Sequence, residues 1–276
     1  MLLEHRKVRF CLQAFLLLAL SLPGAAQETK TEYCMPGFSP YYGPPPFTFR
    51  DNRIISIVFR TTPEVLQELV PKPLLPNPFN LMFIYIGRLN TVSPAGGSYD
   101  YLEAGIGIPV VFSQVPGNYA VCLYLDKAWA IVAGREVYGW PKKDAAITFS
   151  ERDGEISGRV ERFGTVLLSL SGRLEKRVDP IPSQPELPWF LLKIIPSVRK
   201  NAPPDVWQLV STRNTDVKTK ELWNCTATFK LGTGPLDNLG NIKVAEIVGA
   251  QFSVGDFVMD YGEVLHDYLV KKSEKK

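Results

Sequence analysis

Histidine is scarce in this sequence. The 276 residues include only two, His5 and His266. A Ser-His-Asp triad would have to use one of them, and metal sites built from several histidines are excluded. Because the usual general base is nearly absent, any chemistry has to rest on lysine, glutamate, aspartate, tyrosine or arginine. We therefore expect neither a metal nor a cofactor.

Cysteine is also sparse. The chain holds four cysteines and no CxxC spacing, which excludes a dense disulfide framework. Cys122 lies in the apolar run "YAVCLYL" and is expected to be a thiol of the core. Cys34 and Cys225 could pair in an oxidising compartment, but the sequence does not show that they meet.

The signatures of several common site classes are missing. The sequence contains no GxxxxGKS/T phosphate loop, no HExxH or DxDxDG metal motif and no GxSxG nucleophile turn. The run "GIGIPV" at 105–110 is a weak nucleotide-binding signal, because it reads as the beginning of a strand. Asn224-Cys225-Thr226 fits a glycosylation acceptor, but in a strand-like stretch a chance match is an equal alternative.

Neither sign of charge dominates. Lys and Arg number 31 against 28 Asp and Glu, so the balance gives no electrostatic reason to expect a nucleic-acid partner. The basic run "KKSEKK" at 271–276 is interpreted as a solvated tail.

Long apolar runs are confined to the N-terminus. Residues 1–9 carry three basic side chains, and "FCLQAFLLLALSL" then precedes "PGAAQ". This order predicts a secretory signal peptide cleaved after Ala26. The alternative is an uncleaved anchor, for which the run is short. We therefore predict a signal peptide over 1–26 and a single domain over 27–276 that is secreted, or held in the secretory pathway or periplasm, without membrane contact after cleavage.

Short runs rich in β-branched and aromatic residues fill most of the remaining chain. They recur at 53–60, 80–89, 108–113, 119–125, 165–174, 206–213 and 225–231, with turn residues between them. Asp153-Gly154 predicts a hairpin. The pattern favours a mainly β (α+β) fold, an antiparallel, barrel-like sheet with a few flanking helices.

Helical signals are few. "TTPEVLQELV" at 61–70 has Thr62 as a candidate N-cap and Pro63 in the first turn. "AWAIVAGREV" at 128–137 predicts a short helix, and "DYGEVLHDYLVKK" at 260–272 predicts a C-terminal one.

The stretch "GREVYGWPKKD" at 134–144 contains the most suggestive residues. Lys142 and Lys143 stand between aromatic and apolar neighbours. In an extended segment adjacent side chains point to opposite faces, so only one of the two would enter an apolar interior. Burial lowers the pKa of an amine, because the charged form loses its solvation, and a neutral amine attacks carbonyl groups. The alternative is an ordinary solvated turn.

The segment "AGREVYGWPKKDAAITF" resembles the active-site segment of the acetoacetate decarboxylase family. Further resemblances follow in family order over nearly the whole chain after residue 26: "RDNRIISIVFRT", "YLEAGIGIPVVF", "YAVCLYLDKAWAIVAGRE", "FLLKIIPS", "NTDVKTKELW" and "PLDNL" with "VAEIVGAQFSVGDFVMDYGEVLHDYL". The resemblance implies that Lys142 forms a Schiff base, that Lys143 tunes it, and that Arg53 and Glu103 lie in the pocket. An arginine would orient a substrate carboxylate, and a carboxyl group would move protons.

One position departs from the family pattern. Ile84 in "LMFIYIG" stands where the decarboxylases carry a second pocket acid, and the polar neighbour Tyr85 is expected to point to the other face. The resemblance implies a carboxy-lyase that forms a lysine imine with a small β-keto acid or related oxo-acid, most simply a decarboxylase. A Schiff-base aldolase or dehydratase is the first alternative, and a secreted β-barrel that only binds a small carbonyl or apolar ligand is the second. A homo-oligomer is expected from the resemblance alone.

Overall fold

The computed structural model describes residues 31–32, 35–92, 98–179 and 186–270. The chain divides into two compact units, 1–41 and 42–276. In the described part of the first unit, β1 (Thr31–Glu32) pairs with β2 (Met35–Pro36). The predicted signal peptide and Cys34 lie outside the described residues. Cys122 and Cys225 are free thiols, and burial raises the pKa of Cys122 to about 11, as suits a core thiol.

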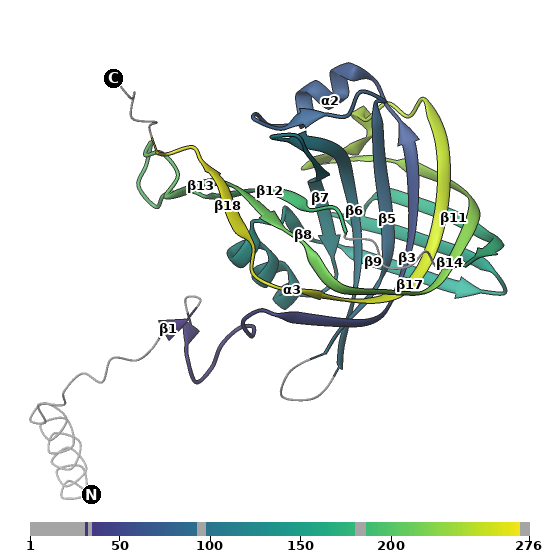
Figure 1. Ribbon diagram of the computed structural model, residues 1–276, viewed down its shortest axis with the longest axis horizontal. Helices are drawn as coiled ribbons and strands as arrows, with labels where there is room; N and C mark the ends of the chain where they lie inside the picture. Colours follow the sequence, from purple (N-terminus) through teal and green to yellow (C-terminus); the bar gives the residue numbers. More distant parts are fainter. Residues whose placement is uncertain (1–30, 33–34, 93–97, 180–185, 271–276) are drawn as a thin grey trace, which may run out of the picture. The chain divides into compact units, whose positions relative to one another are not determined.

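One 14-stranded sheet dominates the second unit (Figure 1). Its order is β18-β13-β12-β7-β6-β5-β3-β17-β14-β11-β10-β9, with β4 added beside β6 and β8 beside β7. The strands of this sheet are β3 (Phe47–Arg60), β4 (Leu75–Pro76), β5 (Leu81–Val92), β6 (Ser98–Phe112), β7 (Val115–Leu125), β8 (Lys142–Asp144), β9 (Ala146–Arg152), β10 (Glu155–Arg162), β11 (Thr165–Val178), β12 (Trp189–Ile195), β13 (Val206–Thr212), β14 (Asn214–Leu231), β17 (Glu246–Met259) and β18 (Glu263–Asp267). A separate hairpin joins β15 (Thr233–Gly234) to β16 (Asp237–Asn238).

The mainly β prediction is confirmed, and the structure refines its geometry. Most neighbouring strands are antiparallel, and the predicted hairpin joins β9 to β10 around Asp153-Gly154. Two pairings, β12 with β7 and β8 with β7, are parallel. Among the described strands the pairing runs as an open path from β18 to β9, so the sheet is not a closed barrel.

The larger of two apolar clusters lies on one face of the central strands. Alternate residues of β3, β5 and β6 are fully or almost fully buried there, including Ile55, Ile57, Ile84, Ile86 and Ile106. Side chains of β9, β10 and β11 join the same cluster, and β9 contacts β5, β6 and β7. The sheet therefore curls until its last strands cover this face. Burying each such side chain stabilises the fold by roughly 1.5–3 kcal/mol.

Two predicted helices are confirmed. The first, α2 (Pro63–Leu69), has Pro63 in its first turn and buries Leu66. The second, α3 (Ala128–Ala133), continues into the π-helix η1 (Gly134–Tyr138) directly before the lysine pair. A 3-10 turn, η2 (Leu239–Asn241), follows the β15–β16 hairpin. No helix within the described ranges is long and apolar enough to cross a membrane.

The predicted C-terminal helix is wrong. Glu263–Asp267 forms β18, which pairs with β13 through a register shift between Leu209 and Val210. The other edge of β13 is paired with β12, so β13 had one edge whose backbone groups needed partners. The spacing of apolar residues at 260–272 fits a helix as well as a strand. Pairing with the open edge of β13 favours the strand.

Candidate active site

A cavity of about 440 Å³ lies against the face of the central strands opposite the apolar core. Phe83 and Tyr85 of β5, Glu103 of β6 and Lys142 of β8 line it. These side chains share a face because β5 pairs with β6, β6 with β7 and β7 with β8 in register. The same face also packs a second apolar cluster, which includes Leu123, Leu125 and Leu191, so packed side chains border the cavity.

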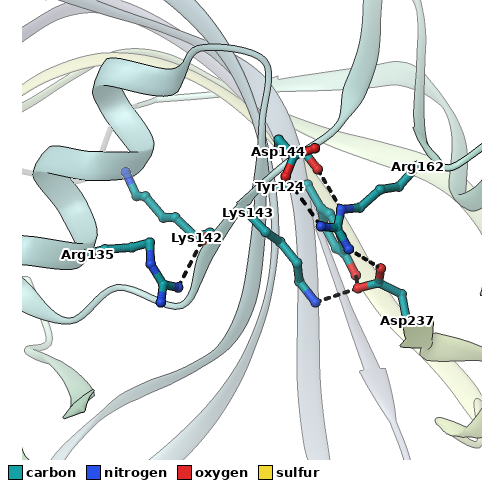
Figure 2. Close-up of polar contacts among 7 residues, drawn as sticks. All are labelled: Tyr124, Arg135, Lys142, Lys143, Asp144, Arg162 and Asp237. Carbon is teal, nitrogen blue, oxygen red and sulfur yellow. Dashed lines mark hydrogen bonds and ion pairs between the residues drawn. The ribbon is translucent and has the colours of Figure 1, made fainter. Parts of the chain in front are cut away.

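Strand alternation separates the two lysines. Lys142 lines the cavity and is 6% exposed, whereas Lys143 is not among the lining residues. Figure 2 shows their side chains extending in different directions from β8. The guanidinium of Arg135 donates to the Lys142 carbonyl at 3.1 Å and fixes the backbone there. The prediction that one lysine enters the interior and the other faces away is confirmed.

Gly134 makes room for the Lys142 side chain. A Cβ atom added at Gly134 would lie 2.6 Å from Cδ and 2.9 Å from Cε of Lys142. Gly134 begins η1, whose last turn is closed by Gly139 in the left-handed conformation at φ 82°. The two glycines of "GREVYGWPKK" therefore have different structural roles. Gly139 adopts the left-handed conformation that closes the turn, and Gly134 leaves room for the Lys142 side chain.

Lys142 and Glu103 form a buried ion pair. Nζ of Lys142 lies 3.1 Å from Oε2 of Glu103, with side-chain exposures of 6% and 7%. Tyr85 donates its hydroxyl to Oε1 of Glu103 at 2.7 Å. Burial, and next the charge of Glu103, raise the pKa of Tyr85 well above its ordinary value, so this hydroxyl keeps its proton. Tyr85, Glu103 and Lys142 thus form a short polar chain ending in an amine.

Aromatic rings surround the ammonium group. Nζ of Lys142 lies 5.7 Å from the ring centre of Tyr101 and 6.0 Å from that of Trp140. Rings at this distance attract a cation through their quadrupole. Two aromatic rings therefore lie close to the amine, and Trp140 is one of the aromatic neighbours of the lysine pair in the sequence.

Lys143 belongs to a different cluster. It forms an ion pair with Asp237, which also accepts hydrogen bonds from Tyr124 at 2.8 Å and from Arg162 at 2.9 Å (Figure 2). Burial alone would raise the pKa of Asp237, but the hydrogen bonds from Lys143, Tyr124 and Arg162 outweigh it, so the pKa lies below its ordinary value. That Lys143 tunes Lys142 stays a prediction, and the contacts of Lys143 show it holding the β15–β16 hairpin on the sheet.

Arg53 also points away from the cavity. Its neighbours Asn52 and Ile54 line the cavity, and Arg53 does not. Its Nε and Nη2 donate to the carboxylate of Glu151 on β9, with the shortest contact at 2.7 Å. The guanidinium lies 5.4 Å from the ring centre of Phe252. The structure therefore brings Lys142 and Glu103 together, and it places Arg53 and Lys143 elsewhere.

The expectation for β5 needs a correction. Ile84 is 0% exposed and lies in the apolar core, so it does not stand at a cavity position. Tyr85 does point to the other face, as expected, and that face is the cavity. The register between β5 and β6 places Tyr85 on the same face of the sheet as Glu103. Had this register been known, strand alternation would have identified Tyr85 as a cavity residue.

The "GIGIPV" run has a structural explanation. A Cβ atom at Gly105 would lie 2.5 Å from the Tyr85 ring, and one at Gly107 would lie 2.3 Å from the Phe83 ring. The two glycines let these rings lie flat over β6 on the floor of the cavity. The run is thus part of the cavity, and it is a strand rather than a phosphate loop.

Metal and histidine chemistry find little support in the described part of the chain. No group of three or more His, Cys, Asp or Glu side chains there could hold a metal ion. His266 lies in β18, where its ring meets the edge of Tyr268 with 4.6 Å between ring centres, and it does not line the cavity. Lysine and carboxyl groups remain the reactive side chains of this site.

Comparisons with known proteins show the family of this chain. A sequence profile of the family described as Acetoacetate decarboxylase (ADC) matches residues 34–269. The chain is 34% identical over 243 residues to a protein of Burkholderia lata named acetoacetate decarboxylase, covering 87% of this chain and 96% of that protein.

Solved structures show the same fold. The chain superposes with a TM-score of 0.75 and 27% identity on a structure described as "Structural Studies of Acetoacetate Decarboxylase", covering 84% of this chain and 94% of that one. A fold-level match at 19% identity, with a TM-score of 0.77, covers 89% of this chain and 100% of the other. It is the enduracididine biosynthesis enzyme MppR complexed with the condensation product of pyruvate and imidazole 4-carboxaldehyde.

Proposed function

Since the chain belongs to the acetoacetate decarboxylase family, we propose that Lys142 forms an imine with the carbonyl group of a small oxo-acid, most simply a β-keto acid that then loses CO2. The observation that carries this proposal is the buried amine of Lys142, 3.1 Å from Glu103 inside an aromatic cavity. Relatives 34% identical to this chain are named acetoacetate decarboxylase, which supports decarboxylation over other imine chemistry.

Imine formation begins with the ion pair. Oε2 of Glu103 has no hydrogen bond within the described residues, so it can accept a proton from the Lys142 ammonium. The neutral amine then attacks the carbonyl carbon and forms a carbinolamine. Protonation of the hydroxyl group by Glu103 releases water and leaves a positively charged iminium.

Decarboxylation follows from the iminium. The electron pair of the bond between the α-carbon and the carboxylate moves toward the nitrogen as CO2 departs, and an enamine forms. A proton returned to the α-carbon regenerates the iminium, and water hydrolyses it to the ketone and the free amine. Tyr85 keeps Glu103 oriented for these transfers through its 2.7 Å hydrogen bond.

A second candidate function is aldol or dehydration chemistry on the same iminium. Both candidate functions use an oxo-acid, so the position of Arg53, whose guanidinium is bound to Glu151 and does not line the cavity, does not separate them. An oxo-acid carboxylate would then lack the guanidinium that the resemblance implies for it. MppR is complexed with a condensation product of pyruvate, although the similarity of this chain to MppR concerns the fold.

Reductive trapping tests the proposal. Borohydride added with acetoacetate, or with pyruvate, should inactivate the protein and leave a mass adduct that fragment spectra assign to Lys142. Lys142→Ala should abolish the adduct, and Lys143→Ala, the matched control, should retain it. CO2 release from acetoacetate then separates decarboxylation from aldol chemistry. An adduct at Lys143 would contradict the assignment, and no adduct with any carbonyl compound would favour the non-catalytic binding protein.

Export and assembly are further parts of the proposal. The basic and apolar pattern of residues 1–26 supports export. N-terminal sequencing of protein from its native host should begin near Gln27, and an intact Met1 in cytosolic material would refute it. The expected homo-oligomer rests on the family resemblance, and light scattering coupled to size-exclusion chromatography tests it.

A further inference from the structure

The cavity is larger than acetoacetate needs. Its volume of about 440 Å³ corresponds to roughly fifteen water molecules at about 30 Å³ each. A four-carbon acid held at Lys142 would leave most of this space to water. Ligand cavities usually enclose most of the surface of their ligand, and this one has room for a substrate larger than acetoacetate.

The extra space is walled by aromatic rings that begin at the amine. The Trp140 ring centre lies 6.0 Å from Nζ of Lys142. Trp189 continues from Trp140, with 5.2 Å between ring centres, and Phe83 continues from Trp189 at 5.7 Å. All three rings line the cavity. This aromatic wall, defined as Phe83, Trp140 and Trp189, gives an apolar substituent a surface that leads away from the reacting carbon.

The wall carries one polar atom without a partner. Nε1 of Trp140 is buried and has no hydrogen bond among the described residues, and Trp140 is 7% exposed. A buried donor that lacks an acceptor is costly. An acceptor on a bound ligand would remove that cost. Arg53 does not line the cavity, whereas Trp140 and Lys218 do, so the carboxylate can take its hydrogen bond from the indole N–H once the Trp140 ring turns to expose it, with Lys218 as the alternative donor.

We propose that the substrate is an oxo-acid with an aromatic or extended apolar substituent, which packs on the aromatic wall while the carboxylate accepts a hydrogen bond from Trp140. This inference rests on the proposed function, because the carbonyl carbon is taken to be the one attacked by Lys142. It adds the substrate class and a binding residue. It also gives a role to Trp189 and Phe83, which continue the wall away from the amine.

The test compares matched carbonyl probes on the full chain. Initial rates of borohydride trapping are measured with acetoacetate and with the β-keto acid in which a phenylethyl group replaces the methyl group. Each rate is divided by the rate of the same probe with a simple free amine. We expect the phenylethyl acid to be trapped at least tenfold faster, the size of preference an apolar pocket gives for added apolar groups. Trp189→Ala should reduce this ratio toward one.

A second pair of probes tests the donor. The phenylethyl acid is compared with the ketone that lacks only its carboxylate, in wild type and in Trp140→Phe. The variant should slow trapping of the acid about tenfold more than trapping of the ketone. Since every result is a ratio of two probes on one sample, partial loss of folded protein cancels.

Each outcome bears on a different claim. Faster trapping of acetoacetate than of the phenylethyl acid would overturn the proposed substrate class and leave the proposed function standing. Equal slowing of acid and ketone by Trp140→Phe would overturn the role of the indole N–H. No adduct with any probe would instead refute the imine itself.

Discussion

Lys142 and Lys143 are neighbours in the sequence and occupy opposite environments. Lys142 is 6% exposed and faces one carboxylate and two rings in a cavity. Lys143 is 31% exposed and pairs with an Asp237 carboxylate that Tyr124 and Arg162 also bind. The first amine can reach a ligand, and the second is held in a network that joins β7, β8 and β10 to β16. One residue of strand alternation therefore separates a reactive group from a structural one.

The same contrast runs through the central strands, since one face carries the larger apolar cluster and the other carries the cavity beside a second, smaller cluster. Ile84 and Tyr85 repeat on β5 what Lys143 and Lys142 show on β8. A change on the core face should act on stability, and a change on the cavity face should act on the reaction.

Ile84→Glu should produce the largest effect, a loss of about 4 kcal/mol of unfolding free energy. A carboxyl group would replace a side chain that is 0% exposed among other apolar ones, and burial of an unpaired charge is among the most destabilising changes. Urea denaturation measures the loss. Tyr85→Phe, one residue away on the cavity face, is the matched control and should cost only about 2 kcal/mol, because it removes one hydrogen bond to the Glu103 carboxylate. Normal stability of Ile84→Glu together with faster acetoacetate turnover would place position 84 in the cavity after all.

These faces explain which parts of the site the sequence could predict. Alternation within "PKKD" was sufficient to separate Lys142 from Lys143, because the segment is extended and paired with β7. It could not assign Arg53, because the register of β3 against β5 shifts between Phe49 and Arg53. Nor could it tell that the side of β5 carrying Ile84 faces the core, since distant strands β9 to β11 cover that side.

The elements of the fold follow a similar division. The hairpin at Asp153-Gly154 and the helix after Thr62 were predictable, because turn residues and Pro63 act locally. The strand at 263–267 was not, because it is stabilised by the edge of β13 some fifty residues earlier in the chain. The hydrogen bond between Tyr85 and Glu103 escaped prediction for the same reason, because the two residues lie on different strands.

Gly134→Ala should lower the trapping rate at Lys142 about 100-fold while the protein still folds. The added Cβ would lie 2.6 Å from Cδ of Lys142, so the lysine side chain must move, and displacement of a reacting group by about 1 Å costs about two orders of magnitude. The atoms displaced are the flexible end of a side chain, so thermal stability should change little. Gly249→Ala is the control, because nothing lies within 4 Å of its Cβ position. Unchanged trapping in Gly134→Ala would mean that Lys142 reacts from another conformation.

Asp237→Asn should cost about 2 kcal/mol at neutral pH, because it removes the buried charge shared by Lys143 and Arg162. The pKa of Asp237 is lower in the folded protein than in the unfolded chain. Its contribution is therefore complete above the unfolded value of about 3.9 and is lost as the pH falls through the folded value.

Unfolding free energies measured between pH 7 and pH 3 test this dependence. The difference between wild type and Asp237→Asn should stay constant down to about pH 5 and shrink below about pH 4. Asp144→Asn is a sharp control, since Asp144 also contacts Arg162 but its side chain is 77% exposed. A pH-independent difference would show that Asp237 acts through its shape rather than its charge. Imine trapping at Lys142 should persist in both variants, because the cluster lies outside the cavity.

Arg53→Gln should have the smallest effect. The ion pair with Glu151 is 40% and 24% exposed, and pairs of this exposure contribute less than about 1 kcal/mol. Because Arg53 does not line the cavity, kcat/KM for an oxo-acid should stay within about threefold of wild type, a difference of about 0.7 kcal/mol. Glu151→Gln is the matched partner variant and should behave alike. A 100-fold loss in Arg53→Gln with the oxo-acid, but not in Glu151→Gln, would show that Arg53 leaves Glu151 to bind the substrate carboxylate, and the division of the sheet into a structural and a reactive face would then break at that strand.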